Sequence, residues 1–251
     1  MEIMGIFNKI FSSAPKLEPA DLSVLRCDIH SHLIPGIDDG VQTMEESLQI
    51  IKYFSTLGYK KIITTPHIII DYYKNTSEII LNGLEKVRAA VKEAGIDIEI
   101  DASAEYYCDL DLEEKIAKKD LIAFGNNYIL FELPFLSAPE NMSKVIFELQ
   151  TNGYKPILAH PERYTFYYKD FQKYYDLKDR GVLFQMNINS LTGHYSLDTK
   201  KIAERMIDEG MIDLIGSDCH NTNHLILMER ARKEKYLHKL LEKPDLLNMS
   251  L

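Results

Sequence analysis

CDIHSHLIPGIDDG, residues 27–40, is an unusual way for a buried strand to end. A short apolar run reaches Ile29 and is followed at once by His30 and His32, and then by a turn that carries two aspartates. A surface loop has no need of so much imidazole. Side chains two apart on an extended chain point to the same face, so His30 and His32 can bind one metal ion. We therefore ask what the rest of the chain adds to this pair.

Short β-branched runs alternate with amphipathic helices along most of the chain. The expected strands cover residues 23–29, 60–67, 96–105, 127–134, 155–160, 182–190 and 211–220. The expected helices cover residues 43–58, 77–95, 141–152, 170–181, 197–210 and 226–243. Thr43 and Glu46 form a capping box at the start of the first helix, and Gly58 ends it. This alternation predicts an α/β fold with a parallel sheet.

Metal-binding residue types gather where these strands end. Of the eight histidines, five stand at strand ends: His30, His32, His67, His160 and His220. The same ends carry Glu105, Glu132, Asn189 and Asp218. A closed barrel brings all its strand ends to one mouth. An open doubly wound sheet, the other arrangement that the pattern allows, would scatter the outer ones. We therefore expect a TIM-like barrel with its site at that mouth.

The chemistry that suits this set is binding of divalent metal ions. Imidazole with carboxylate favours Mn, Fe, Zn or Mg over a soft thiolate site. With Asp39 there are nine candidate ligands: His30, His32, Asp39, His67, Glu105, Glu132, His160, Asp218 and His220. Nine exceed the needs of one ion, so we expect two or three. With three ions the local charge is about +2, which attracts an anion and stabilises a phosphoryl group under attack.

Composition limits the other possibilities. The chain has 251 residues, of which 45% are hydrophobic, which suits one large domain from residue 21 to 251 behind a loosely ordered extension of residues 1–20. A net charge of −9 argues against nucleic acid as a partner. No apolar run is long enough to span a membrane, and the first 20 residues make a poor secretory signal. Three cysteines without a C-x-x-C pair fit a reducing compartment, so we expect a cytoplasmic protein.

Six segments in this order resemble one known family: DIHSHLIPGIDDG, TTPH, AEYY, FELPF, ILAHPERY and GSDCH. They are similar to the PHP (polymerase and histidinol phosphatase) superfamily. Within it they look most like the manganese-dependent protein-tyrosine phosphatases of bacterial capsule and exopolysaccharide operons, the CpsB/YwqE type. The resemblance covers about residues 24–240. The combination of His-x-His, HPER and SD-x-H is specific, whereas each piece alone is weak.

The resemblance implies a distorted (β/α)7 barrel with three metal ions, manganese in the first place. The first ion is expected at His30, His32, Glu105 and Asp218, the second at Glu105, Glu132 and His160, and the third at Asp39, His67 and His220. Arg163 falls at the phosphate-contacting arginine, and with His160 and Asp218 it completes the expected catalytic group. The implied substrate is phosphotyrosine on the C-terminal tail of a bacterial tyrosine kinase that regulates capsule or exopolysaccharide synthesis.

Other functions remain open at this point. The same ligands would serve histidinol-phosphate phosphatase, another phosphoesterase or a nuclease, although the acidic charge disfavours the last. A metal-binding module without activity would close every coordination position. A cysteine-dependent tyrosine phosphatase is excluded, because none of the three cysteines begins a Cys-x5-Arg motif. Tyrosine-rich segments around residues 72, 106 and 164–175 offer rings for a phosphotyrosyl group or for ordinary half-buried surface.

Overall fold

The structure is a computed structural model that describes residues 17–251. The expected loose extension of residues 1–20 therefore lies mostly outside the described residues. Its last residue, Ala20, is held in place, because its amide donates to the Arg232 carbonyl at 2.7 Å and its carbonyl accepts from Arg232 Nε at 2.9 Å. Among the described residues, no helix has the length and apolar character that crossing a bilayer requires.

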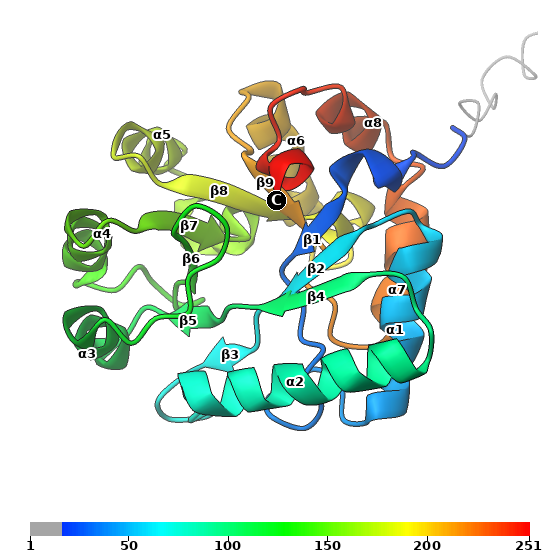
Figure 1. The fold of residues 1–251 in the computed structure, drawn as a ribbon. Helices are drawn as coiled ribbons and strands as arrows, with labels where there is room; N and C mark the ends of the chain where they lie inside the picture. The colour runs from blue at the N-terminus through cyan, green and yellow to red at the C-terminus, as the bar shows by residue number, and fades with distance from the viewer. Residues whose placement is uncertain (1–16) are drawn as a thin grey trace, which may run out of the picture.

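Two parallel sheets form the centre of the fold (Figure 1). The first has the order β1-β2-β4, from the strands β1 (Cys27–Ile29), β2 (Lys61–Thr64) and β4 (Glu99–Ala102). The second has the order β3-β5-β6-β7-β8-β9, from β3 (His67–Ile68), β5 (Glu105–Tyr107), β6 (Tyr128–Glu132), β7 (Lys155–Ala159), β8 (Leu183–Asn187) and β9 (Leu214–Gly216). The α/β class and the parallel pairing that the sequence predicts are thus confirmed.

The sequence predicts seven strands, and two of them are each broken in the structure. Residues 60–67 divide into β2 and β3, and residues 96–105 divide into β4 and β5. Pro66 lies at the first break, where it has no amide to donate to a neighbouring strand. Its carbonyl instead accepts from the Glu105 amide at 3.1 Å. Each break moves the chain from the first sheet to the second, so the expectation of seven unbroken strands was wrong.

The two sheets curl until their outer strands, β1 and β9, meet. Ser31 and Cys219 form an isolated parallel bridge just beyond the two strands. The Asp218 amide donates to the His30 carbonyl at 2.7 Å, and the His32 amide donates to the Cys219 carbonyl at 2.9 Å. The strand ends that carry the candidate ligands are therefore brought together at one side of the curled sheet.

Helices cover the outer faces of the sheets. They are α1 (Met44–Thr56), α2 (Ser77–Glu93), α3 (Leu110–Lys118), α4 (Met142–Thr151), α5 (Gln172–Asp179), α6 (Leu197–Asp208), α7 (Thr222–Ala231) and α8 (Lys235–Leu241). In Figure 1, α3, α4 and α5 flank the second sheet, while α1, α2 and α7 lie beside the first. Helix α2 shows how they pack: its buried residues recur every three to four positions, at Ile80, Leu84, Val87 and Val91.

Two helices differ from the sequence expectation. Helix α3 was not predicted, because only Leu112 and Ile116 of its nine residues are buried and the rest of the segment is highly charged. The prediction of a single helix over residues 226–243 was wrong, because α7 and α8 are separate helices. Glu234 has extended backbone angles between them, and this bend allows Leu237 and Leu240 to be buried.

A short 3₁₀ turn, η6 (Leu247–Ser250), seals the end of the sheet away from the candidate site. Asn248 is fully buried there. Its Oδ1 accepts from the Ile215 amide at 2.9 Å, and its Nδ2 donates to the carbonyls of Cys27 and Ile215 at 2.9 and 2.8 Å. One side chain near the C-terminus therefore holds β1 and β9 together.

Candidate metal centre

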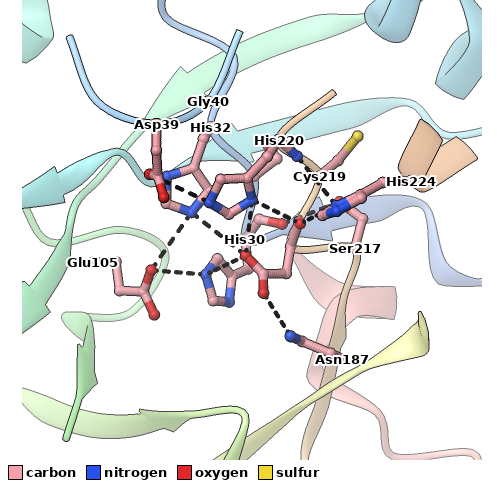
Figure 2. A network of polar contacts seen from close by, with 12 residues as sticks. His30, His32, Asp39, Gly40, Glu105, Asn187, Ser217, Cys219, His220 and His224 are labelled. Carbon is pink, nitrogen blue, oxygen red and sulfur yellow. Dashed lines mark hydrogen bonds and ion pairs between the residues drawn. The ribbon is translucent and has the colours of Figure 1, made fainter. Parts of the chain in front are cut away.

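Nine histidine, aspartate and glutamate side chains meet at the C-terminal ends of the strands. Figure 2 shows part of this cluster from close by. Glu105 lies at its centre: Oε2 is 3.0 Å from His30 Nε2 and 3.3 Å from His67 Nδ1, and Oε1 is 3.1 Å from His160 Nε2. Glu132 lies on the far side, 3.4 Å from His67 Nδ1. These contacts join residues from β3, β5 and β6 with the segments that follow β1 and β7.

Asp218 divides its two carboxylate oxygens between different partners. Oδ1 faces the imidazoles of His30, His32 and His220 at 3.4, 3.5 and 3.4 Å. Oδ2 accepts from Asn187 Nδ2 at 2.6 Å and from Arg163 Nη1 at 3.1 Å. One oxygen therefore belongs to the histidine cluster, and the other belongs to a set of hydrogen-bond donors beside it.

The loop after β1 supplies the outer edge of the cluster. Asp39 Oδ1 lies 3.6 Å from His67 Nε2 and 3.5 Å from His220 Nε2. Its side chain is half exposed, whereas His30 and His32, which follow β1, are fully buried. The neighbouring Asp38 is directed inward, where its Oδ2 accepts from His32 Nδ1 at 2.7 Å and from the His67 amide at 3.0 Å. The two aspartates thus have different tasks.

Backbone strain marks three of the strand ends. His30, His160 and Asp218 have φ angles of +138°, +33° and +48°. Residues other than glycine rarely adopt such backbone angles, and backbone strain of this kind is concentrated at functional sites. Each of the three comes within two residues of the end of a strand. The sharp change of direction turns each side chain into the cluster.

The imidazole rings are oriented from outside the cluster. His30 donates from Nδ1 to Gln185 Oε1 at 2.7 Å, and His32 donates from Nδ1 to Asp38. Such outer hydrogen bonds fix the ring of a metal ligand and direct its other nitrogen inward. His32 Nε2 and His67 Nδ1 are buried, lie 3.5 and 3.3 Å from Glu105 Oε2, and form no hydrogen bond. Among the described residues, the cluster therefore leaves imidazole nitrogens unsatisfied, which is the situation that a bound cation would relieve.

The pKa values of two groups in the cluster, Glu132 and His160, are shifted by burial and by neighbouring charges. Burial and the neighbouring Glu105 carboxylate raise the pKa of Glu132 well above its usual range. Burial and the nearby Arg163 guanidinium lower the pKa of His160 to about 4, so its ring is neutral at neutral pH. Neutral imidazole is the form that binds a metal ion. Two buried carboxyl groups that face one another can both be ionised only if positive charge lies between them.

Potential ligand atoms fall into four groups in which all atoms lie within 4.8 Å of one another. The groups are His32–Asp39–His67–His220, His30–His32–Glu105, His30–His160–Asp218 and His67–Glu105–Glu132. Of the ligand sets that the resemblance implies, the group His30–His32–Glu105 contains all of the first set except Asp218, and the group with Asp39 contains the whole third set. The group with Glu132 contains His67 in place of His160, although His160 Nε2 is also 3.8 Å from Glu132 Oε2.

A cavity of about 540 Å³ opens above the cluster. Its wall includes the expected phosphate contact, Arg163, and two tyrosines from a segment that the sequence offered for a phosphotyrosyl group, Tyr72 and Tyr73. Phe135, Tyr195 and His224 also line it. The three cysteines are buried, and burial raises the pKa of each thiol. In Figure 2 the Cys219 sulfur points away from the histidines, as expected for a packing residue.

Some of the sequence expectations fall elsewhere. Asn189 is buried in a 3₁₀ turn and does not face the cluster, and β8 ends instead at Asn187, which contacts Asp218. The tyrosines at 164 and 174 are core residues, not surface for a ligand. Gln185 and Asn187 were missed, although they alternate on β8 in the same i, i+2 pattern as the His-x-His pair. Phe135 and Tyr195 carry no such signal, because loops alone position them.

Most of the chain is similar in sequence to known proteins. The family model described as capsular polysaccharide synthesis, CpsB/CapC, matches residues 26–241. The tyrosine-protein phosphatase YwqE of Bacillus subtilis is 28% identical over 195 residues, which are 77% of each chain. The putative tyrosine-protein phosphatase CapC of Staphylococcus aureus is 29% identical over 220 residues, 86% of this chain and 85% of the relative.

Solved structures give the same picture. A structure from the study of YwqE from Bacillus subtilis and CpsB from Streptococcus pneumoniae, described as unique metal-dependent tyrosine phosphatases, superposes with a TM-score of 0.78 at 25% identity. The superposition covers 89% of this chain and 90% of the other. The lactonase Lmo2620 of Listeria monocytogenes, at 12% identity and a TM-score of 0.55, shares the fold alone.

Proposed function

Because the chain belongs to the CpsB/CapC family of capsular polysaccharide synthesis, we propose that it is a metal-dependent protein-tyrosine phosphatase. The observation that carries the proposal is the mostly buried cluster of five histidines and four carboxylates beside an arginine in an open cavity. Relatives from three bacterial genera bear the name tyrosine-protein phosphatase. The reaction is the hydrolysis of a phosphate monoester, with the chain acting as a phosphoric monoester hydrolase.

Three divalent ions, manganese in the first place, fit the donor set. The nine ligands would be His30, His32, Asp39, His67, Glu105, Glu132, His160, Asp218 and His220, with Glu105 shared at the centre. The unsatisfied imidazole nitrogens and the crowded carboxylates support this assignment. When bound, such ions lower the pKa of water and neutralise charge on a phosphoryl group.

The residues of the chain position the substrate. Arg163 would hold phosphate oxygens, because a guanidinium offers paired donors in the geometry that phosphate accepts. Asp218 holds Arg163 Nη1 at 3.1 Å, so the arginine side chain is oriented before the substrate binds. His160 stays neutral beside it and acts as a ligand and not as a cation. These roles of Arg163, His160 and Asp218 make up the catalytic group in our proposal.

Rings at the mouth of the cavity support a phosphotyrosyl substrate. Tyr72 is 80% exposed at the edge of the cavity, and the half-buried Tyr107 also lines it. Aromatic rings at this place can stack on the tyrosyl ring of a phosphorylated peptide. We propose that the peptide is the C-terminal tail of a bacterial tyrosine kinase that regulates capsule or exopolysaccharide synthesis. A small phosphate such as histidinol phosphate would make no use of these outer rings.

The architecture and the location follow from the same proposal. We propose that the curled sheets form a distorted (β/α)7 barrel, supported by the bridge between Ser31 and Cys219. Residues 21–251 would then form a single PHP-type phosphatase domain. We propose that the enzyme acts in the cytoplasm, which suits three unpaired cysteines.

Metal removal and reconstitution test the proposed function. We expect EDTA to abolish hydrolysis of a phosphotyrosine peptide, and Mn²⁺ to restore it in step with the metal content measured by elemental analysis. Iodoacetamide should have little effect, because the thiols are buried with raised pKa values. Histidinol phosphate, assayed at equal enzyme, should turn over at least about tenfold more slowly by kcat/KM.

Two outcomes would contradict the proposal. Activity that resists chelation but is lost to iodoacetamide would exclude the metal mechanism. Faster turnover of histidinol phosphate than of the phosphotyrosine peptide would move the function to small-molecule phosphate chemistry at the same site. The His220→Ala variant removes one proposed ligand from the edge of the cluster and leaves Arg163 in place, so its metal content and its activity should fall together.

A further inference from the structure

The Arg163 guanidinium lies between two aromatic rings in the wall of the cavity. Its Cζ is 4.3 Å from the ring centroid of Tyr195 and 4.8 Å from that of Phe135. The bond from Nη1 to Asp218 Oδ2 holds it from a third direction. Only 22% of the Arg163 side chain is exposed. Cation–π contacts strengthen when water is excluded from the cation, so both rings are placed where they hold it most firmly.

The two rings come from different loops, and each is tied to the metal-ligand cluster. Phe135 follows β6 and stacks on His160 with ring centroids 5.8 Å apart and planes 19° apart. Tyr195 precedes α6, and its hydroxyl accepts from Asn187 Nδ2 at 3.3 Å and donates to Asp218 Oδ2 at 3.5 Å. A change in the cluster would therefore move the rings, and the rings would move the guanidinium.

We propose that Phe135 and Tyr195 are positioning residues that clamp Arg163 in the orientation in which it receives the substrate phosphate. Asp218 uses one N–H of the guanidinium, and the remaining donors are left for phosphate oxygens. An arginine on a free side chain would have to be ordered at each binding event. A clamped arginine is ordered in advance, and donors that are organised in advance stabilise a developing charge most effectively. This inference rests on the proposed function.

The first test compares two changes at Tyr195 in the metal-loaded, full-length enzyme. Tyr195→Leu removes the ring and should lower kcat/KM for a phosphotyrosine peptide by about tenfold, with a similar rise in the inhibition constant of inorganic phosphate. Tyr195→Phe keeps the ring and should recover most of this loss. The metal content of both variants should equal that of the parent protein, which separates a clamp from an indirect effect on the ligands.

Phe135→Leu provides an independent test, because its ring is 45% exposed and its removal leaves little cavity in the core. We expect the same direction of change as for Tyr195→Leu. Phe147→Leu is the matched control: this phenylalanine is 63% exposed on α4 and does not line the cavity. Its kinetic constants should match those of the parent protein.

A double-mutant cycle identifies Arg163 as the residue through which the rings act. In an Arg163→Ala background, the further change Tyr195→Leu should have no additional effect on kcat/KM or on phosphate inhibition. Additive losses would overturn the clamp, as would a Tyr195→Leu variant with normal phosphate inhibition or with reduced metal content. If the parent enzyme cleaves no phosphotyrosine, the proposed function fails. Phosphate binding measured by calorimetry, weaker in Tyr195→Leu than in the parent, would then still support the clamp, and equal binding would overturn it.

Discussion

Gly40 shows how closely the site depends on single residues. It lies in the loop between His32 and α1, and a Cβ atom at this position would overlap the backbone oxygen and Cβ of His32. The close approach allows the loop to fold over the ring and to direct Asp38 onto His32 Nδ1 at 2.7 Å. Gly216 is also close to the site, since a Cβ atom there would overlap the side chains of His30 and Gln185. Both positions require glycine because of space and not because of positive φ.

Gly40→Ala should therefore weaken metal binding. We expect about tenfold weaker affinity for Mn²⁺ or more, since loss of outer-sphere support to a ligand typically has an effect of this size. Titration of the metal-free protein with Mn²⁺, followed by electron paramagnetic resonance, measures it. Ser250→Ala is the control, because it removes only an exposed hydroxyl at the end of the sheet away from the cluster. Equal affinities for Gly40→Ala and the parent would show that the loop does not need this contact.

At the scale of elements, the helices are begun by side chains that the sequence makes visible. Thr43 Oγ1 accepts from the Glu46 amide at 3.2 Å at the start of α1. The predicted capping box is only half present, because the Glu46 carboxylate accepts from the Gln42 amide and not from Thr43. Gly58, with a φ of +90°, follows the end of α1 as predicted. Thr76 caps α2 in the same way by accepting from the Ile79 amide at 3.2 Å.

Thr76→Ala tests the contribution of such a cap. We expect the free energy of unfolding to fall by about 1 kcal/mol, because one amide of the first turn of α2 loses its acceptor. Urea unfolding followed by circular dichroism gives the value. Thr76→Ser keeps the hydroxyl and should remain close to the parent. A Thr76→Ala variant as stable as the parent would mean that water replaces the cap without penalty.

The sequence predicted the elements and the candidate cluster better than it predicted the connections between them. The spacing of the apolar residues along the chain predicted five of the helices to within a few residues of their observed ends. It could not show that β2 and β3 are separate, because the β-branched residues from Ile62 to Thr65 continue directly into Pro66 and His67, and only the neighbouring strand reveals the shift. The histidines were visible since His-x-His is rare at a strand end. The rings of Phe135 and Tyr195 were not, because no spacing connects them with Arg163.

Across the whole molecule, residues from both ends of the chain support one another. Asn248 satisfies the Ile215 amide and the carbonyls of Cys27 and Ile215 in a fully buried place. Asn248→Ala should lower the free energy of unfolding by about 3 kcal/mol, because buried backbone groups are left without partners. Chemical denaturation of the metal-free protein measures the change without a contribution from bound ions. Ser250→Ala, which removes an exposed hydroxyl from the same turn, is the control and should change little. A loss below about 0.5 kcal/mol for Asn248→Ala would show that solvent reaches these groups.

The meeting of β1 with β9 also has a consequence for the order in which the protein is made. The strand β1 is synthesised before its partner β9, which follows almost 190 residues later, and Asn248, which locks the two together, lies 221 residues after Cys27. Until then the His30–His32 pair has neither Asp218 nor His220 beside it. A nascent chain can therefore bury parts of its helices as they appear, while the metal-ligand cluster is assembled only after β9 and the segment that follows it have been synthesised. The enzyme would become competent to bind its ions in a single late event, and not gradually.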